Sequence, residues 1–313
     1  MKTLNATGMG IYLPKVMHTN ATLPKLDKPI TEQQLERIGV TRRGWAGEGE
    51  GIAEMGAAAA RNALDAAGLQ GRDIDLIVLA NWTQRRYIPE FAPKLQKLIG
   101  APSAFAFDIS GACTGFANGV GIAHHMLSGN RYKRALVVAS ETTSQRGRPN
   151  SKASLVFGDA AAAWVLELDA GKGSEILDYE MISDGEHHDV MSINEAGHVV
   201  THIDQRELNA LAAQSFTTAC QNVLERNRLT IADVDWIVPH SGTAGIQALL
   251  VKTLNVPAEK VLSNFSVVGN VSSAAIPVSL DHFVATGKIK KGDLILSPTT
   301  GTGWYYASLL YRL

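Results

Sequence analysis

An internal repeat constrains this chain more than any other feature of its sequence. Residues 60–83 and residues 219–243 carry identical side chains at eight positions separated by 160 residues, including both aspartates of an Asp-x-Asp motif. Each copy has the pattern of an amphipathic helix, a polar turn and a short β-branched strand, which is half of an alternating α/β unit. The sequence therefore predicts a duplicated α/β chain, with one half over residues 1–170 and the other over residues 171–313.

Two further segments extend the repeat at slightly smaller spacings. The segment FAFDISGAC, which ends at Cys113, aligns with LSNFSVVGN, which ends at Asn270, at a spacing of 157 residues. Ala135–Ser140 aligns with Asp293–Pro298 at a spacing of 158 residues. No Pro- or Ser-rich linker separates the halves, so we expect them to pack together around a ligand site at the interface where strand ends converge.

Composition and charge argue against several classes of protein. The chain carries 29 Lys and Arg residues against 30 Asp and Glu residues, without a block of like charge, so we expect no nucleic-acid partner. Its longest apolar run, Ala160–Leu166, has seven residues, whereas a membrane-spanning helix needs roughly 20. The N-terminal sequence has no apolar signal stretch, so we expect a cytoplasmic protein without membrane contact whose two cysteines are free thiols.

Cys113 stands where a β-like segment gives way to a helix that the pattern starts near Thr114. A thiol at a helix N-terminus lies at the positive end of the helix dipole, which favours the nucleophilic thiolate. The small neighbours Ser110-Gly111-Ala112 allow a substrate to approach closely. A buried structural cysteine explains the position equally well. Cys220, in contrast, falls in the middle of a predicted helix, where we expect an inert side chain.

Two candidate residues come from the second half. His240 follows the strand of the second repeat copy, and the segment Ser241-Gly242-Thr243 after it opens a helix. The imidazole is therefore held at the carboxyl end of a strand, where α/β proteins place catalytic groups. Asn270 follows Gly269, and Gly-Asn is strong turn chemistry. Its alignment with Cys113 instead favours a side chain that faces the same cavity from the other half.

Other catalytic motifs are weak or missing. The turn Gly301-Thr302-Gly303 can present backbone donors to an oxyanion. The phosphate-binding patterns GxGxxG and GxxxxGK[ST] and the hydrolase pattern GxSxG are incomplete or absent. The histidine pairs at 124–125 and 187–188 lack the i, i+4 spacing of metal ligands on a helix, so we expect no metal site.

Seven motifs follow one another along nearly the whole chain. They are IYLP (Ile11–Pro14), Thr19-Asn20, IGVTRR (Ile38–Arg43), AFDISGACTGF around Cys113, LVFGDAAAA (Leu155–Ala163), VPH at His240 and GNVSSAAIP at Asn270. In this order and spacing the chain resembles the thiolase-fold condensing enzymes, specifically the ketoacyl-acyl-carrier-protein synthase III group. The resemblance implies a thiolase-like α/β fold in which two duplicated halves form five layers, α-β-α-β-α. It also implies a homodimer and a catalytic set of Cys113, His240 and Asn270.

The chain departs from the family pattern at several positions. Family members that take their acyl group from coenzyme A usually clamp the adenine with a Trp and an Arg, where this chain has Gln33 and Ser151. Gly245 stands where an Arg of the family contacts the carrier protein. The family's G-G-G-F-T-W-G stretch reads GTGWYYA here, which adds bulk at Trp304. These differences indicate a specialised acyl group and leave the acyl donor open between coenzyme A and acyl carrier protein.

The resemblance implies a reaction in two steps. Cys113 attacks an acyl thioester, and the backbone N–H groups of Cys113 and of the Gly301–Gly303 turn hold the oxyanion. A malonyl thioester on acyl carrier protein then loses CO2 while His240 and Asn270 stabilise the enolate. The carbanion attacks the acyl group on Cys113 and releases a β-ketoacyl product. We expect no metal and no redox cofactor, in a pathway of fatty-acid initiation or, as the departures favour, of specialised polyketide metabolism.

Further substrate contacts are expected at Arg37, Arg85, Arg86 and Trp304. Arg85 and Arg86 belong to the loop NWTQRRYIPEF, where a carrier phosphopantetheine or an acidic acyl chain is one partner. A simply solvated loop is the competing interpretation and the favoured one.

Three other functions compete with condensation. An acyltransferase that moves the Cys113-bound acyl group to a hydroxyl or amine needs a histidine base but gains little from Asn270. A hydrolase of the same fold admits water instead, and the sequence does not separate it from a synthase. A non-catalytic partner in a heterodimer of condensing enzymes predicts an eroded site, against which the complete set of three residues argues.

Overall fold

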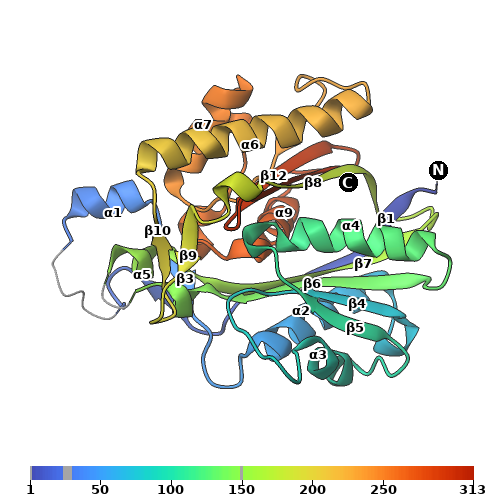
Figure 1. Cartoon of the computed structure of the whole chain (residues 1–313). Helices are drawn as coiled ribbons and strands as arrows, with labels where there is room; N and C mark the ends of the chain where they lie inside the picture. The colour runs from blue at the N-terminus through green and yellow to red at the C-terminus, as the bar shows by residue number, and fades with distance from the viewer. Residues whose placement is uncertain (1, 24–29, 149–150) are drawn as a thin grey trace.

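The structure, a computed structural model, describes residues 2–23, 30–148 and 151–313 (Figure 1). One series of hydrogen-bonded strands runs in the order β11-β12-β13-β8-β1-β7-β6-β4-β5. The strands from the first half of the chain are β1 (Leu4–Tyr12), β4 (Leu76–Ala80), β5 (Phe105–Ile109), β6 (Arg134–Thr142) and β7 (Asp159–Leu168). Those from the second half are β8 (Ser174–Ser183), β11 (Trp236–Ile237), β12 (Leu294–Gly301) and β13 (Tyr305–Arg312).

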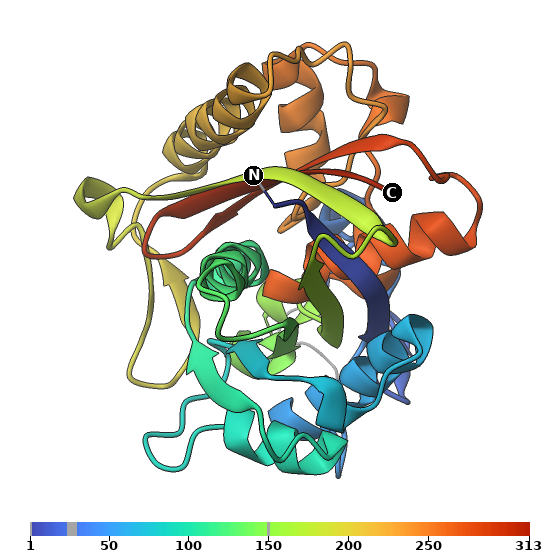
Figure 2. The same ribbon diagram turned by 90° about the vertical axis from the view of Figure 1, so that its right-hand side faces the viewer.

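The strands form two layers with helices outside and between them. The two sets of strands meet only where β1 pairs with β8, from Leu4–Ile176 to Ala6–Ser174, and the series folds over there (Figure 2). The main helices are α2 (Ile52–Ala67), α3 (Ala92–Ile99), α4 (Gly115–Ser128), α6 (Gln205–Arg226), α7 (Ala244–Leu254) and α9 (Ala275–Ala285). α2 and α3 cover one outer face, α4 and α9 lie between the strand layers, and α6 and α7 cover the other outer face (Figures 1 and 2). The predicted five-layer α/β arrangement is confirmed.

Burial on both faces explains the apolar sequences of the central strands. β4 is LIVLA and is buried at every residue, and β6 is buried at all residues but its first. Strands that are covered by helices on both faces read as continuous apolar runs rather than as alternating ones. α4 packs between the two layers because its glycines permit close contact. A methyl group on Gly119 would lie 2.8 Å from Val137 of β6, and one on Gly121 would lie 2.6 Å from Met181 of β8.

Shorter elements connect these layers. They are the helices α1 (Glu32–Ile38), α5 (Lys152–Val156) and α8 (Phe265–Val268), the strand pairs β2 (Met17–Thr19) with β3 (Arg42–Gly44) and β9 (Met191–Ile193) with β10 (Val199–Thr201), and the 3-10 turns η1 (Gly71–Asp73), η2 (Ala112–Thr114), η3 (Thr143–Arg146), η4 (Gly185–His187), η5 (Ala258–Lys260) and η6 (Ser272–Ala274). Across the described ranges, no helix has both the length and the apolar character needed to cross a bilayer.

The repeat keeps a spacing of 160 residues in the strands of the two layers. Asp75 Oδ2 accepts a hydrogen bond from the backbone N–H of Arg134 (3.1 Å). Asp235 Oδ2 accepts one from the backbone N–H of Leu294 (2.8 Å). β6 and β12 therefore correspond at 160 residues, and the spacing of 158 taken from the ungapped alignment was wrong.

The turns that precede α4 and α9 correspond at the same spacing. Each begins with a residue of positive φ, 47° at Ala112 and 52° at Ser272. Cys113 therefore corresponds to Ser273, and its predicted alignment with Asn270 was wrong. The reason is the helical turn α8, which lengthens the second half ahead of η6, whereas only two residues separate β5 from η2. An ungapped comparison cannot accommodate that insertion.

Candidate active site

Cys113, His240 and Asn270 line one cavity of about 160 Å³ between the two halves of the chain. Cys113 lies in η2 and belongs to the first half. His240 follows β11, and Asn270 lies between α8 and η6, so both come from the second half. The structure thus brings together the three residues that the sequence pattern singled out.

The backbone around Cys113 is fixed on both sides. Gly111, with φ of 152°, and Ala112 turn the chain from β5 into η2. Thr114 Oγ1 donates to the Gly111 carbonyl (2.7 Å), and Thr299 Oγ1 donates to the Cys113 carbonyl (3.0 Å). Cys113 therefore stands directly before α4, where the sequence predicted the start of a helix.

The place of Cys113 at the start of a helix is not enough to make its side chain a thiolate. Burial raises its pKa to about 12, the Ser272 hydroxyl opposes this shift, and nearby Glu141 adds to it. Ser272 Oγ lies 3.4 Å from the Cys113 sulfur. The free protein therefore holds a neutral thiol near pH 7, contrary to the thiolate that the helix start alone suggested. Formation of the thiolate depends on donors beside the sulfur.

The end of β12 packs against the backbone amide of Cys113. A methyl group on Gly301 would stand 2.9 Å from the Cys113 nitrogen and 3.1 Å from Ala112 Cβ, so a side chain does not fit there. The predicted oxyanion donors, the Cys113 amide and the Gly301 turn, are thus neighbours. Thr302 also lines the cavity. Gly303 does not line it in the described structure, and its φ of 80° serves the turn from β12 into β13.

His240 is held as a neutral imidazole. Its backbone N–H donates to the Pro298 carbonyl (2.9 Å), which fixes the segment after β11. Burial lowers the pKa of the His240 ring to about 4, and a contact with the Ser272 backbone acts in the opposite direction. His240 Nδ1 is buried and has no hydrogen-bond partner among the described residues. A neutral imidazole has one N–H donor, so it can stabilise negative charge without carrying a formal charge itself.

The amide of Asn270 is oriented by its own turn. Asn270 Oδ1 accepts a hydrogen bond from the backbone N–H of Ser272 (2.9 Å). The NH₂ group therefore points away from Ser272, and Nδ2 donates to the Gly242 carbonyl (3.3 Å). A methyl group on Gly242 would lie 3.2 Å from His240 Nε2 and 3.6 Å from Asn270 Nδ2. Two nitrogen atoms from separate segments therefore approach one point in the cavity.

Glu141, a residue that the sequence patterns did not single out, is buried beside this site. Glu141 Oε1 accepts from Ser273 Oγ (2.5 Å), and Oε2 accepts from the backbone N–H groups of Trp82 and Thr83 (3.4 Å each). Burial raises the pKa of the Glu141 carboxyl to about 7, against the effect of these hydrogen bonds. Glu141 belongs to the first half and Ser273 to the second, so this bond joins the two halves. Ser273 is also the residue that corresponds to Cys113 in the repeat.

Trp82 and Ser272 are two further residues that sequence reasoning missed. Both line the cavity. Trp82 Nε1 donates to Ser272 Oγ (2.6 Å). The available signal was position: Asn81-Trp82-Thr83 follows the fully buried β4, at the strand end where α/β proteins place functional groups.

A hairpin and a tryptophan close the cavity from the second half. Met191 and Ile193 of β9 line it, and Thr302 Oγ1 donates to the Met191 carbonyl (3.2 Å). Trp304, expected to contact substrate, also lines the cavity, and its Nε1 donates to Ser215 Oγ of α6 (3.1 Å). The bulk predicted at Trp304 therefore forms part of the wall.

The arginine candidates lie elsewhere. Arg37, in the last turn of α1, is exposed and does not line the cavity. Arg85 and Arg86 are exposed in the loop after β4 and line a separate hollow that includes Asp108. Arg86 lies over the Phe91 ring at 5.7 Å. The exposure of Arg85 and Arg86 fits the favoured interpretation of a solvated loop, and a substrate contact by any of the three arginines stays a prediction.

Apart from Trp304, the positions that depart from the family pattern do not form the cavity wall. Gln33 and Gly245 are exposed, and Ser151 donates to the Arg148 carbonyl (2.6 Å). None of the three lines the cavity as described. Cys220 is buried in α6 and, like Cys113, is a free thiol, as predicted.

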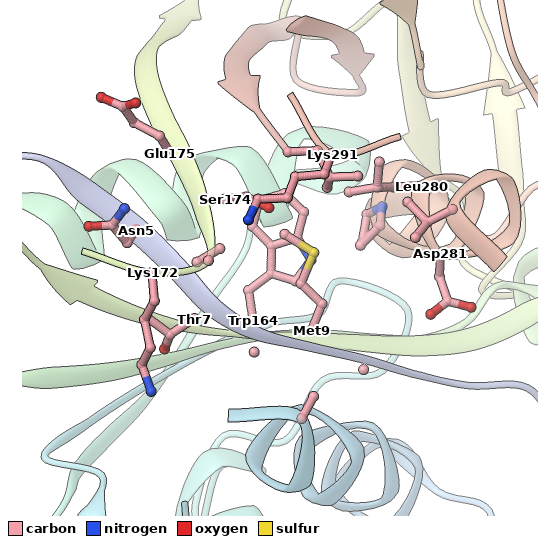
Figure 3. Close-up of a pocket in the computed structure, with 18 of the residues that line it drawn as sticks. Asn5, Thr7, Met9, Trp164, Lys172, Ser174, Glu175, Leu280, Asp281 and Lys291 are labelled. Atoms are coloured by element: carbon pink, nitrogen blue, oxygen red, sulfur yellow. The ribbon is translucent and has the colours of Figure 1, made fainter. Parts of the chain in front are cut away.

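A larger hollow of about 1000 Å³ lies between β1, β8 and α9 (Figure 3). Met9 and Trp164 lie near its centre. Lys172, Glu175 and Asp281 extend from its rim in different directions. Its charged groups do not converge on one point, so it lacks the arrangement of a reaction centre that the smaller Cys113 cavity has.

Comparison with known proteins agrees with this fold and cavity. Residues 107–185 match the family described as 3-oxoacyl-[acyl-carrier-protein (ACP)] synthase III, and residues 224–313 match its C-terminal region. A beta-ketoacyl-[acyl-carrier-protein] synthase III of Agrobacterium fabrum is 36% identical, with 97% of this chain and 98% of that protein covered. One of Actinobacillus pleuropneumoniae is 34% identical, with 97% of each covered.

Solved structures give the same result. The 3-oxoacyl-[acyl-carrier-protein] synthase III of Aquifex aeolicus has a TM-score of 0.91 and 33% identity, with both chains fully covered. The priming beta-ketosynthase of the R1128 polyketide biosynthetic pathway has a TM-score of 0.89 and 28% identity, with 99% of this chain and 96% of that chain covered. The fold and cavity define a thiolase-fold acyltransferase. The chain belongs to the beta-ketoacyl-[acyl-carrier-protein] synthase III family.

Proposed function

We propose that this enzyme loads an acyl group onto Cys113 and condenses it with a malonyl thioester. The observation that carries the proposal is the approach of the Cys113 sulfur, His240 Nε2 and Asn270 Nδ2 to one cavity between the halves. A nucleophile with two neutral donors opposite it suits a reaction that first forms a thioester and then an enolate.

In the first step, the Cys113 sulfur attacks the carbonyl carbon of an acyl thioester. The tetrahedral oxyanion accepts hydrogen bonds from the Cys113 amide and from the adjacent Gly301 turn, and each such donor contributes about 3 kcal/mol. The bond to the leaving sulfur breaks, and that sulfur departs with the proton of the Cys113 thiol. Gly301 supports this role because any side chain there would collide with the Cys113 nitrogen.

In the second step, the thioester carbonyl of a malonyl group accepts hydrogen bonds from His240 Nε2 and Asn270 Nδ2. The carbon–carbon bond to the carboxylate breaks, CO2 leaves, and its electron pair forms the enolate that the two donors stabilise. The enolate carbon attacks the Cys113 thioester, and the Cys113 sulfur leaves and takes up a proton. The lowered pKa of His240 supports this role, because the imidazole is already neutral near pH 7.

The carrier of the malonyl group in this proposal is acyl carrier protein. The names of the relatives and of the Aquifex aeolicus structure contain this carrier, and the R1128 neighbour is named as a priming ketosynthase of polyketide biosynthesis. Gln33 and Ser151, in place of the adenine-binding pair of coenzyme A users, support a specialised acyl donor. The acyl pathway and a place in the cytoplasm stay predictions from the sequence.

We also propose a homodimer that forms at the open edge of β5. β5 ends the strand order, so one side of its backbone has no strand partner in the described chain. Phe105 on this strand is 52% exposed, and Tyr87 and Ile88 in the preceding loop are 89% and 93% exposed. An unpaired strand edge beside exposed apolar side chains is suited to pairing with a second copy.

Intact-mass measurement tests the loading step. Incubation with a panel of acyl thioesters on coenzyme A and on acyl carrier protein is expected to add one acyl mass to the protein, and Cys113→Ala is expected to remove the adduct. No adduct with any donor would reject the enzyme mechanism. Asn270→Ala keeps Cys113, so it is expected to load normally while its decarboxylation of malonyl thioester falls about 100-fold, the effect of losing one such donor.

The same assay separates the alternatives. A loaded enzyme that passes its acyl group to a hydroxyl or an amine, but not to malonyl thioester, would support the simple transferase. Release of free acid would support the hydrolase. Unchanged decarboxylation by Asn270→Ala would reject the proposed role of the amide.

A further inference from the structure

Ser272 contacts all three residues of the proposed site. Its hydroxyl lies 3.4 Å from the Cys113 sulfur, and its backbone N–H donates to Asn270 Oδ1 (2.9 Å). Its backbone also contacts the His240 ring. Ser272 opens η6 with a φ of 52°, a conformation that non-glycine residues adopt rarely and that directs it across the interface between the halves.

Trp82 determines the direction of the Ser272 hydroxyl. An indole Nε1–H only donates, so the 2.6 Å contact between Trp82 Nε1 and Ser272 Oγ makes the serine oxygen the acceptor. The serine proton is then free, and the Cys113 sulfur is the only other partner of that hydroxyl within the described residues. A hydroxyl that accepts from one donor is polarised toward donating to the next group.

We propose that Trp82 and Ser272 form a donor chain that stabilises the Cys113 thiolate, with the indole N–H directed at the serine hydroxyl and the hydroxyl directed at the sulfur. Both are positioning residues in this proposal, because they act through Cys113. The proposal rests on the proposed function of Cys113 as the nucleophile. It identifies a side-chain donor that opposes the effects of burial and of Glu141, both of which raise the pKa of the Cys113 thiol.

In the part of the chain that the structure describes, few other titratable groups face the sulfur. Glu141 of β6 and His240 are the titratable side chains beside it. The turn η6 and the end of β12 contribute only uncharged side chains. On β13, Tyr311 is hydrogen-bonded to Ser297, and burial raises its pKa above the ordinary range. The histidines of α4 lie about three turns along the helix from Cys113. Among the described residues, Ser272 is thus the side-chain hydrogen-bond donor to the sulfur, and the backbone N–H of Cys113 adds to it.

The test is the rate of Cys113 alkylation by iodoacetamide as a function of pH, followed by peptide mass so that Cys220 does not interfere. Below the pKa, the rate is proportional to the thiolate fraction, so a rise of one pKa unit slows alkylation tenfold at a fixed pH. Ser272→Ala and Ser272→Gly both remove the hydroxyl, but glycine relieves the positive φ and alanine does not. A change shared by both variants therefore reports the hydroxyl rather than backbone strain.

We expect Ser272→Ala and Ser272→Gly to be alkylated about tenfold more slowly than the wild type at each pH below the transition. Trp82→Phe, which keeps an aromatic ring in the wall, is expected to slow the reaction by a smaller factor, about threefold, because the hydroxyl stays but loses its orientation. Ser241→Ala is the matched control. Ser241 is a buried serine next to His240 without a hydrogen bond to the sulfur, and its variant is expected to follow the wild-type curve.

Wild-type rates in both Ser272 variants would overturn the proposal, as would slowing in only one of them. A Trp82→Phe curve that coincides with the wild type would remove the indole from the chain. Melting temperatures measured on the same samples identify a variant that has not folded. If one Ser272 variant fails to fold, the alkylation rate of the other variant tests the proposal. Failure of the proposed function has a different signature, namely alkylation that depends on Ser272 in a protein that never loads an acyl group.

Discussion

At the residue scale, the groups around the Cys113 sulfur are kept neutral by burial rather than by charge pairs. Burial lowers the pKa of His240 to about 4 and raises that of Glu141 to about 7. Near pH 6 neither side chain is predominantly charged. A cavity with uncharged donors stabilises an oxyanion or an enolate only while that charge exists, which favours the transition state over the resting state.

The raised pKa of Glu141 makes the stability of the protein depend on pH. Its folded pKa lies above its unfolded value of 4.5, so its contribution to stability is fully present below pH 4.5 and is lost as pH rises through about 7. Glu141→Gln resembles the protonated carboxyl and does not titrate. Over this window, the free energy of unfolding of the wild type is expected to fall relative to Glu141→Gln by about 1.4 kcal/mol per pH unit.

Urea titrations of both proteins at pH 4.5, 5.5, 6.5 and 7.5 measure this difference. Other groups with raised values, such as Asp159, are present in both proteins and cancel in the comparison. Parallel stability curves would show that Glu141 ionises at the same pH in the folded and the unfolded chain, which contradicts the account of its burial.

At the scale of elements, glycines set the distance between α2 and β1. A methyl group on Gly10 of β1 would lie 2.4 Å from the Ala63 nitrogen and 2.5 Å from the Ala59 carbonyl, both in the backbone of α2. Backbone atoms on two rigid elements cannot move aside separately, so the helix would have to shift from the sheet. This contact holds the outer helix layer, and it is remote from the Cys113 cavity.

Gly10→Ala is therefore expected to lower the free energy of unfolding by about 1–3 kcal/mol. Gly129→Ala is the matched control, because Gly129 has a φ of −71° and its nearest neighbour to a methyl group, the Met126 carbonyl, is 3.5 Å away. That control is expected to be neutral or slightly stabilising. Thermal and urea unfolding compare the two, and equal stabilities would contradict the close packing of β1 on α2.

Element order was largely predictable from the sequence, whereas the register of the repeat was not. The Asp-x-Asp turns at 73–75 and 233–235 and the buried strands after them give local patterns that survive duplication. The four-residue helix α8 has no periodic pattern of its own, so the aligned pair Cys113 and Asn270 was displaced by three positions. The cavity nevertheless contains both, because Asn270 immediately precedes the turn that holds the true counterpart, Ser273.

The candidate site was predictable only where a residue type carries chemistry by itself. Cys113, His240 and Asn270 meet that condition and stand in recognisable motifs. Trp82 and Ser272 acquire significance through a contact that joins segments 190 residues apart, and the local sequence signals only the place of Trp82 after a buried strand. The exposed loop that carries Arg85 and Arg86 shows the opposite case, in which a chemically suggestive pair lies outside the cavity.

At the scale of the whole molecule, the open edge of β5 makes the association of two copies testable. Light scattering with size-exclusion chromatography is expected to give a mass twice the chain mass of 33.5 kDa. Phe105→Asp places a charge on the exposed strand edge and is expected to yield the single-chain mass, since an unpaired charge in an apolar interface is costly.

Val284→Asp is the control for that experiment. Val284 is also an exposed apolar residue, 40% exposed, but it belongs to α9 on the rim of the larger hollow. It is expected to keep the double mass. A single-chain mass for the wild type, or for both variants, would contradict dimerisation at β5.

The most direct test of the central claim, that one half supplies the nucleophile and the other half the donors for its condensation, is a single turnover of the loaded enzyme. Protein carrying one acyl group on Cys113 is mixed with malonyl-acyl carrier protein, and both proteins are then weighed by mass spectrometry. The account predicts that the enzyme returns to its unmodified mass while the carrier gains the acyl group and loses CO2, and that His240→Ala and Asn270→Ala stay loaded. Acyl release as free acid, or equal turnover by those two variants, would contradict it.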